Sequence, residues 1–327
     1  MIGILLTGIG AGAAAALLFV SATSGVLLSV FLFYLAPLPI MIVALGWSHW
    51  AGLIAAAVAA AMLGAVFGKL LFAIFLVLVG APSWWFGYLA LLGRPIANGG
   101  SAQMEWYPPG RLVLWAALFG AAVTAGAVMI FWGNEAAIRQ SLRSALDLVL
   151  RAGPDGPALP QVAPQASDAE NADLLVDIMV QILPPVAAVT AALTQAANLW
   201  LAGLVVRLSG RLQRPWPNLT ALALPPLAAM LYGVSLAAAF LPDLPGLVAR
   251  LFAATLTTAF AMVGFAVLHV VTRGMQSRIA ILAGAYACTF FLALWPVLLM
   301  TVLGVAETLL GLRERFSRRG PPVAPSL

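Results

Sequence analysis

The sequence predicts an all-α protein, a polytopic transmembrane helical bundle of about eight spanning helices followed by a broken C-terminal hairpin. Three observations lead to this fold class. Hydrophobic residues make up 63% of the 327 residues and charged residues only 8%, whereas soluble domains carry about 25% charged residues. Apolar runs of about 20 residues recur, and each can cross a bilayer as a helix. The alternating segments of a transmembrane β-barrel are absent.

The predicted spanning helices share long apolar runs separated by polar, proline or glycine residues. They are 2–20, 25–46, 51–67, 70–92, 111–132, 178–206, 221–241 and 247–271. The last apolar run, 279–311, is about 50 Å long as one helix at 1.5 Å per residue, whereas the bilayer core is about 30 Å thick. Because a proline interrupts this run at "WPVLL", two short helices are expected there.

The basic residues indicate topology. With both termini in the cytoplasm and the last run folded as a hairpin, most of the 16 basic residues lie inside. Those left outside are Lys69, Arg139, Arg143, Arg151 and Arg250. This distribution follows the positive-inside rule of a bacterial inner-membrane protein. Arginines at helix ends also favour lipid headgroups as partners over nucleic acid.

The chain divides into four predicted regions. Residues 1–132 form an N-terminal transmembrane bundle, 133–177 an extramembrane amphipathic helix and Pro-rich linker, 178–311 a C-terminal transmembrane bundle, and 312–327 a basic cytoplasmic tail. In the second region, charged residues at positions 135, 139 and 143 step by four, as on one face of a surface helix. This excursion is a lid, a docking element or a connector.

Enzyme signatures are missing. "GAVFGKL" resembles a phosphate loop, but it has too few residues between its glycines and Leu70 stands where Ser or Thr binds magnesium. His49 and His269 lack metal-binding spacing, and there is no G-x-S-x-G motif. The single Cys288 excludes an intramolecular disulfide and a cysteine-based metal site. The sequence therefore predicts a protein that is not an enzyme and has no metal site or cofactor.

Polar and aromatic residues inside the spans are the candidate ligand-binding residues. Gln195 and Asn198 share one face of the sixth helix, where they either bind a ligand or hold helices together. Trp85 lies in "APSWWFGY", which is expected to break its helix and to form a cavity wall or an interfacial aromatic belt. Tyr286 and Trp295 in the last apolar run are further candidates for lining a pocket.

A face of small residues on the first helix is the candidate docking surface. "TGIGAGAAAALLF" places Gly8 and Gly12 four residues apart, and Ala11 and Ala15 repeat this spacing. Small residues allow helices to approach closely. This face either binds a membrane coupling protein or another subunit, or it packs inside the bundle.

The end of the sixth helix is basic and aromatic. In "NLWLAGLVVRLSGRLQRPWPNL", three arginines are expected to hold the helix end in the cytoplasm, and Trp216 to lie at the membrane interface. These arginines are Arg207, Arg211 and Arg214. Glu307 is expected to pair with Arg313 or another arginine of the tail.

The same stretch carries a resemblance to a known family, together with "GFAVLHVVTRG", "LAGAYACTFFLALWPVLLMTVLGVAETLLGLRERF" and "YLAPLPIMIVALGW". Over nearly its whole length the chain resembles the YybS-like family of uncharacterised bacterial membrane proteins. This resemblance implies an inner-membrane helical protein and no established catalytic residues. More remotely, the chain is similar to S components of energy-coupling-factor transporters, which bind vitamins or metal ions and dock through Ala-x-x-x-Ala faces.

Two functions are therefore expected. The first is a solute-binding transporter component, which holds a small neutral or amphipathic molecule in the bundle and docks a coupling partner through the first helix. The alternative is a membrane scaffold or assembly factor, which binds partner proteins through the first helix, the 134–177 excursion and the basic tail.

Overall fold

The computed structural model describes residues 2–24, 26–98, 101–131, 140, 143–144, 166–292 and 294–317. Helices dominate these residues, and seven helical segments among them are long and apolar enough to cross a membrane. The predicted all-α polytopic bundle is therefore confirmed. Most of the predicted excursion at 133–177 lies outside the described residues.

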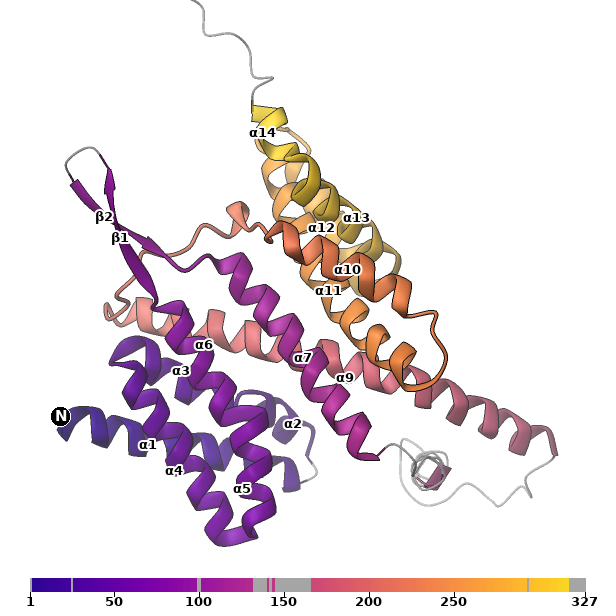
Figure 1. The fold of residues 1–327 in the computed structure, drawn as a ribbon, viewed down its shortest axis with the longest axis horizontal. Helices are drawn as coiled ribbons and strands as arrows, with labels where there is room; N and C mark the ends of the chain where they lie inside the picture. The colour runs from indigo at the N-terminus through magenta and orange to yellow at the C-terminus, as the bar shows by residue number, and fades with distance from the viewer. Residues whose placement is uncertain are drawn as a thin grey trace, which may run out of the picture.

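The helices form two groups on either side of a central pair (Figure 1). The first group is α1 (Ile2–Val20), η1 (Ser21–Ser24), α2 (Leu27–Tyr34), α3 (Pro37–Gly46), α4 (His49–Phe67), α5 (Lys69–Phe75), η2 (Leu76–Gly80) and α6 (Ala81–Ala90). The central pair is α7 (Pro109–Phe131) and α9 (Ala166–Leu208). The second group is η3 (Leu219–Ala221), α10 (Pro226–Ala238), α11 (Asp243–Val271), α12 (Arg278–Leu292), α13 (Leu294–Leu310) and α14 (Leu312–Ser317).

Proline explains where two predicted spans differ from the structure. The span expected at 221–241 contains only the 13 residues of α10, about 20 Å long, because Pro225 and Pro226 start the helix late. The span expected to break at "APSWWFGY" instead continues from Lys69 to Ala90. A π-helical turn, Leu76–Gly80, precedes Pro82 and lets the helix accommodate the proline ring.

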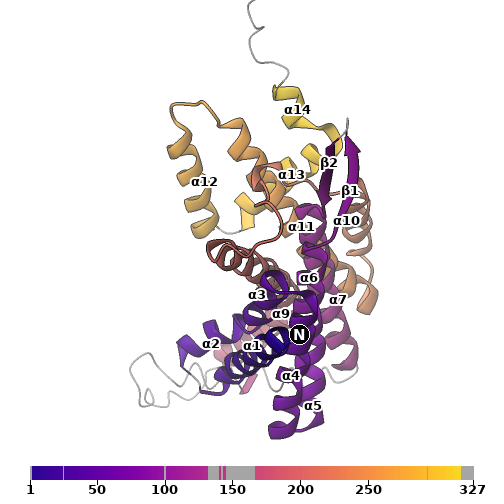
Figure 2. The ribbon, with the colours of Figure 1, turned by 90° about the vertical axis from the view of Figure 1, so that its left-hand side faces the viewer.

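The final apolar run forms two helices, as predicted. α12 ends at Leu292 and α13 begins at Leu294, so that Pro296 lies in the first turn of α13, where no backbone donor is required. Figure 2 shows the two helices running in opposite directions. Only α13 packs closely on α11, and α12 has no buried residue.

One helix is longer than predicted, and one hairpin was not predicted. α9 begins at Ala166 and contains Pro184 and Pro185, so it is much longer than the expected span at 178–206. Between α6 and α7, β1 (Gly93–Asn98) and β2 (Ser101–Trp106) form an antiparallel hairpin that no sequence pattern above predicted. This hairpin projects from the bundle near the end of α6 (Figure 1).

Candidate functional site

The predicted polar pair lies in a helix contact. Gln195 and Asn198 are 3% and 2% exposed. Asn198 Nδ2 donates to the carbonyl oxygens of Tyr34 and Thr194, both at 2.8 Å. The Tyr34 carbonyl is available because the helix is interrupted between α2 and α3, where Leu38 N donates to Leu35 O instead. Asn198 therefore ties α9 to this interruption.

The three predicted aromatic residues lie on other helices than this pair. Trp85, Tyr286 and Trp295 belong to α6, α12 and α13, and are 41%, 48% and 71% exposed. The Tyr286 hydroxyl lies 2.9 Å from His269 Nε2. The structure therefore does not bring the five candidate ligand residues into one site.

The small-residue face of α1 is covered by α4. A Cβ atom added at Gly8 would lie 2.8 Å from Ile54 Cγ2, and one added at Gly12 would lie 2.7 Å from the Ala55 carbonyl oxygen. Ala15 is fully buried and Ala11 packs against the same cluster. Of the two expectations for this face, the structure shows packing inside the bundle.

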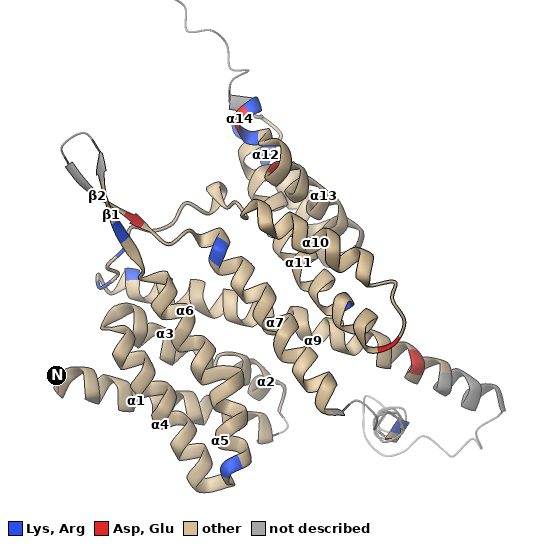
Figure 3. Ribbon diagram, in the orientation of Figure 1, with Lys and Arg blue, Asp and Glu red and all other residues tan. Residues whose placement is uncertain are grey.

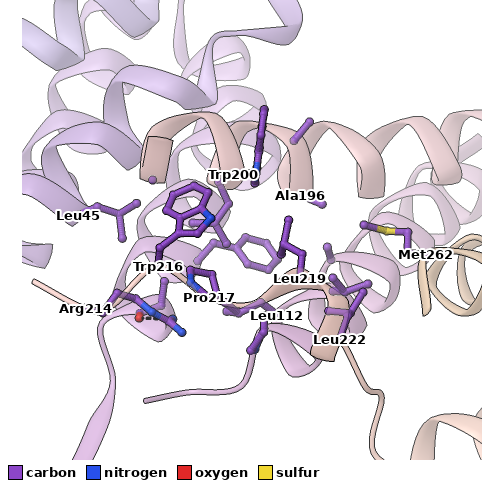
Figure 4. Close-up of a pocket in the computed structure, with 18 of the residues that line it drawn as sticks. Leu45, Leu112, Ala196, Trp200, Arg214, Trp216, Pro217, Leu219, Leu222 and Met262 are labelled. Carbon is purple, nitrogen blue, oxygen red and sulfur yellow. Dashed lines mark hydrogen bonds between the residues drawn. The ribbon is translucent and has the colours of Figure 1, made fainter. Parts of the chain in front are cut away.

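A cavity of about 440 Å³ lies between α7, α9 and residues 209–225, which we call the α9–α10 connection. Figure 4 shows Trp200 and Ala196 of α9 on one side, and Trp216 and Pro217 of the connection near them. Leu112 of α7 contributes a further apolar wall. Among the described residues that line the cavity, Arg214 is the only charged one.

The chain leaves α9 through a glycine turn. Gly210 has a φ of 70°, and Arg211 N donates to Val206 O at 3.0 Å, which together close the helix in a Schellman motif. Arg207, in the last turn of α9, stacks over the ring of Trp216, which lies beyond the glycine turn, with its Cζ 5.0 Å from the ring centroid. Trp216, expected at the membrane interface, is therefore held in the cavity wall.

Arg214 crosses from the connection to the preceding elements. Its Nη1 donates to Ala90 O at 2.8 Å, its Nη2 donates to Tyr107 O at 3.3 Å, and its Cζ lies 6.0 Å from the Trp106 ring centroid. Its Nε is buried and has no hydrogen-bond partner among the described residues. Burial lowers the pKa of the Arg214 guanidinium, because the surrounding apolar groups disfavour its charge.

Arg313 of α14 anchors the other end of the connection, and each of its three guanidinium nitrogens has a partner. Its Nε lies 2.7 Å from Glu307 Oε1, which confirms the predicted pair. Its backbone N–H donates to Glu307 Oε2 at 2.9 Å. Its Nη1 and Nη2 donate to the carbonyl oxygens of Thr220 and Leu222 at 2.6 and 2.9 Å.

The charges gather toward one end of the bundle. Figure 3 shows basic residues in the β-hairpin, the α9–α10 connection and α14, with few elsewhere in the helices. Within the described part of the chain, no group of three His, Cys, Asp or Glu side chains is placed to hold a metal ion. The arrangement offers an apolar cavity beside one guanidinium group.

Sequence reasoning assigned Arg214 and Trp216 only to topology and the interface. The proximity of an arginine, a tryptophan and two prolines in "RPWP" was the available signal. It does not show that Ala90, Tyr107 and α9 surround this segment. Ala90 and Tyr107 lie 124 and 107 residues from Arg214 in the sequence.

Comparison with known proteins gives a family and no detailed relative. Residues 13–308 match the family model described as "Predicted membrane protein (DUF2232)". No curated protein and no solved structure matches the chain. Because the family model covers most of the sequence, the chain belongs to this family of predicted membrane proteins.

Proposed function

We propose that this protein is a solute-binding component of a bacterial inner membrane, and that it holds a small apolar or amphipathic molecule in the cavity beside α9. The cavity of about 440 Å³ carries the proposal. Its volume is in the range of about 300–1,000 Å³ that small-molecule sites occupy, and such sites combine apolar walls with few polar groups.

The orientation is part of the proposal. The basic end formed by the β-hairpin, the α9–α10 connection and α14 faces the cytoplasm, in keeping with the positive-inside rule. Both termini are then cytoplasmic. The cavity lies beside the connection at this end, so it is accessible from the cytoplasmic side of the bilayer.

The proposed role is non-enzymatic, because the sequence lacks the nucleophile, metal and phosphate-loop spacings discussed above. The transporter part of the proposal rests only on the resemblance of Ala11 and Ala15 to the Ala-x-x-x-Ala motif of S components of energy-coupling-factor transporters. A coupling subunit would need a surface other than the Gly8–Gly12 face, which α4 covers. The opposite face of α1 offers exposed Leu6 and Leu17.

Filling the cavity tests the proposal. Ala196 lines the cavity, so Ala196→Phe is expected to occupy it. Val205 lies on the same helix, is 43% exposed and does not line the cavity, so Val205→Phe is the matched control. Native mass spectrometry of protein extracted with its own lipids should find a bound small molecule in the wild type and in Val205→Phe, but not in Ala196→Phe. Retention of the same molecule in Ala196→Phe contradicts the proposal.

One observation favours the scaffold alternative. The β1–β2 hairpin extends away from the helices and carries exposed Met104. If the protein is a scaffold, replacing residues 95–104 by a short Gly-Ser turn should abolish the chemical cross-linking of partner proteins to it. It should leave a molecule in the cavity bound if the solute-binding role is correct.

A further inference from the structure

We infer that Arg214 is the anion-binding residue of the cavity, and that the ligand is an amphipathic anion with a carboxylate or phosphate head at Arg214 and a hydrocarbon chain between α7 and α9. This inference rests on the proposed solute-binding function. It adds the chemical class of the solute and the residue that selects it.

The first argument is the difference between two arginines that fix the same connection, Arg214 within it and Arg313 of α14. Each donates to two backbone carbonyl groups, Arg214 to those of Ala90 and Tyr107 and Arg313 to two of the connection itself. Arg313 also has the Glu307 carboxylate. For Arg214, the structure shows no carboxylate partner among the described residues, and its Nε makes no hydrogen bond.

The second argument is chemical. Backbone carbonyl groups satisfy donors but do not neutralise a guanidinium charge, and a partly buried charge is costly unless it is paired. A guanidinium group has five N–H donors in a planar fork that matches the oxygens of carboxylates and phosphates. Arg214 uses two of its nitrogens on protein carbonyls, so donors remain for an anion.

The third argument is the position of Arg214 in the cavity. Figure 4 shows Arg214 at one end of the space, with Met262 and Leu222 at the opposite end and Trp200 and Ala196 along the side. The polar group is thus terminal and the rest of the lining is apolar. A molecule with one charged end and one hydrocarbon chain complements this distribution. The basic residues at the same end of the bundle also attract anions.

A purely structural role for Arg214 predicts something different. If the side chain only ties the connection to Ala90 and Tyr107, removing its charge should weaken acidic and neutral ligands equally. The relevant measurement is therefore the preference for an anion over a neutral molecule of the same chain length. Trp200 and Trp216 line the cavity and can report on a brominated chain through fluorescence quenching.

The experiment compares 11-bromoundecanoic acid with 11-bromoundecanol on the full chain in phosphatidylcholine nanodiscs. The saturable part of the quenching gives the affinity of each probe. The acid is expected to bind about tenfold or more tightly than the alcohol, as a charge-assisted hydrogen bond allows. Arg214→Gln should remove this preference and Arg214→Lys should retain part of it. Arg111→Gln removes an exposed charge outside the cavity lining and should leave the preference unchanged.

The outcomes separate this inference from the proposed function. Equal binding of acid and alcohol by the wild type, or an unchanged preference in Arg214→Gln, overturns the assignment of Arg214 while the cavity remains a binding site. An equal loss of preference in Arg111→Gln also overturns it, because diffuse charge then explains the effect. If neither probe shows saturable quenching, or if Ala196→Phe does not abolish it, the proposed function fails as well.

Two competition experiments then identify whether the anion is a membrane lipid or a free molecule, and whether its head group is a carboxylate or a phosphate. Each of these results supports the inference. Phosphatidylglycerol added to the nanodiscs should displace the bromo acid if the natural ligand is a membrane lipid. A free single-chain anion is indicated if it does not. Competition of dodecyl phosphate with the bromo acid then shows whether the site binds a phosphate or a carboxylate head group more tightly.

Discussion

The two ends of the α9–α10 connection use the same residue type in opposite ways. At the Arg313 end, a carboxylate and two carbonyl groups satisfy the guanidinium, whose side chain is 15% exposed. At the Arg214 end, the guanidinium donates to two carbonyl groups, its Nε has no hydrogen-bond partner in the described part of the chain, and the side chain lines a cavity. A saturated arginine ties helices together, whereas an unsaturated one beside a cavity is suited to a ligand.

Two glycines show the same contrast in packing. A Cβ atom added at Gly304 of α13 would lie 2.0 Å from the Phe260 carbonyl oxygen of α11. A Cβ atom added at Gly203 of α9 would meet only Trp216 within 4 Å, at 3.5 Å. The Arg313 side is therefore closely packed, and the Arg214 side leaves room.

The largest expected effect comes from breaking the saturated pair. Glu307→Leu leaves the Arg313 charge buried without a carboxylate, which should lower the free energy of unfolding by about 3–5 kcal/mol. Denaturant titration of the purified protein, followed by circular dichroism, measures the change. The double variant Glu307→Leu/Arg313→Met should recover much of the loss, since no charge is then left unpaired. A double variant as unstable as the single one contradicts this account.

The glycine pair gives the next effect and a matched control. Gly304→Ala forces α13 away from α11 and should lower the free energy of unfolding by about 1–3 kcal/mol. Gly203→Ala should be neutral or stabilising by about 0.5–1 kcal/mol, because alanine favours the helix and its methyl group fits. The same denaturant titration measures both. Equal destabilisation by the two substitutions would contradict the proposed difference in packing between Gly304 and Gly203.

A smaller effect on stability is expected at Arg214. Arg214→Gln loses two hydrogen bonds but also removes an unpaired charge, so the free energy of unfolding should fall by about 1–2 kcal/mol. At one fixed concentration, an amphipathic anion should raise the Tm of the wild type more than that of the variant, because the stabilisation by a ligand grows with its affinity for the folded state. Thermal unfolding with and without undecanoic acid is the test. An equal rise in both proteins would argue against Arg214.

The smallest effect is expected at the exposed pair of the β-hairpin. Arg94 and Glu105 form an ion pair whose side chains are 76% and 46% exposed, so solvent screens their attraction. Glu105→Gln should change the free energy of unfolding by about 0–1 kcal/mol and leave the probe preference intact. Denaturant titration and the quenching assay are the measurements. A large loss in either would show that the hairpin contributes to the site.

Elements with strong local signals could be predicted from the sequence. Seven apolar runs form helices of spanning length, and the last run divides near Pro296, because length and hydrophobicity are properties of each segment alone. The ion pair between Glu307 and Arg313 could also be predicted, since the two residues are only six positions apart in the sequence. The hairpin was missed although Asn98 and the glycines after it form a turn signal, because the flanking strands are short and only weakly apolar.

By itself, the sequence determined the membrane class, the apolar helices and the asymmetry of the basic residues. Only the tertiary structure decided which helix faces meet. It placed α4 on the Gly8–Gly12 face and the Tyr34 carbonyl against Asn198, and it left a cavity beside Arg214. The physical reason is that helix periodicity specifies which residues share a face but not what covers that face. In a chain that is apolar nearly all around its helices, close packing and a few polar contacts make that choice.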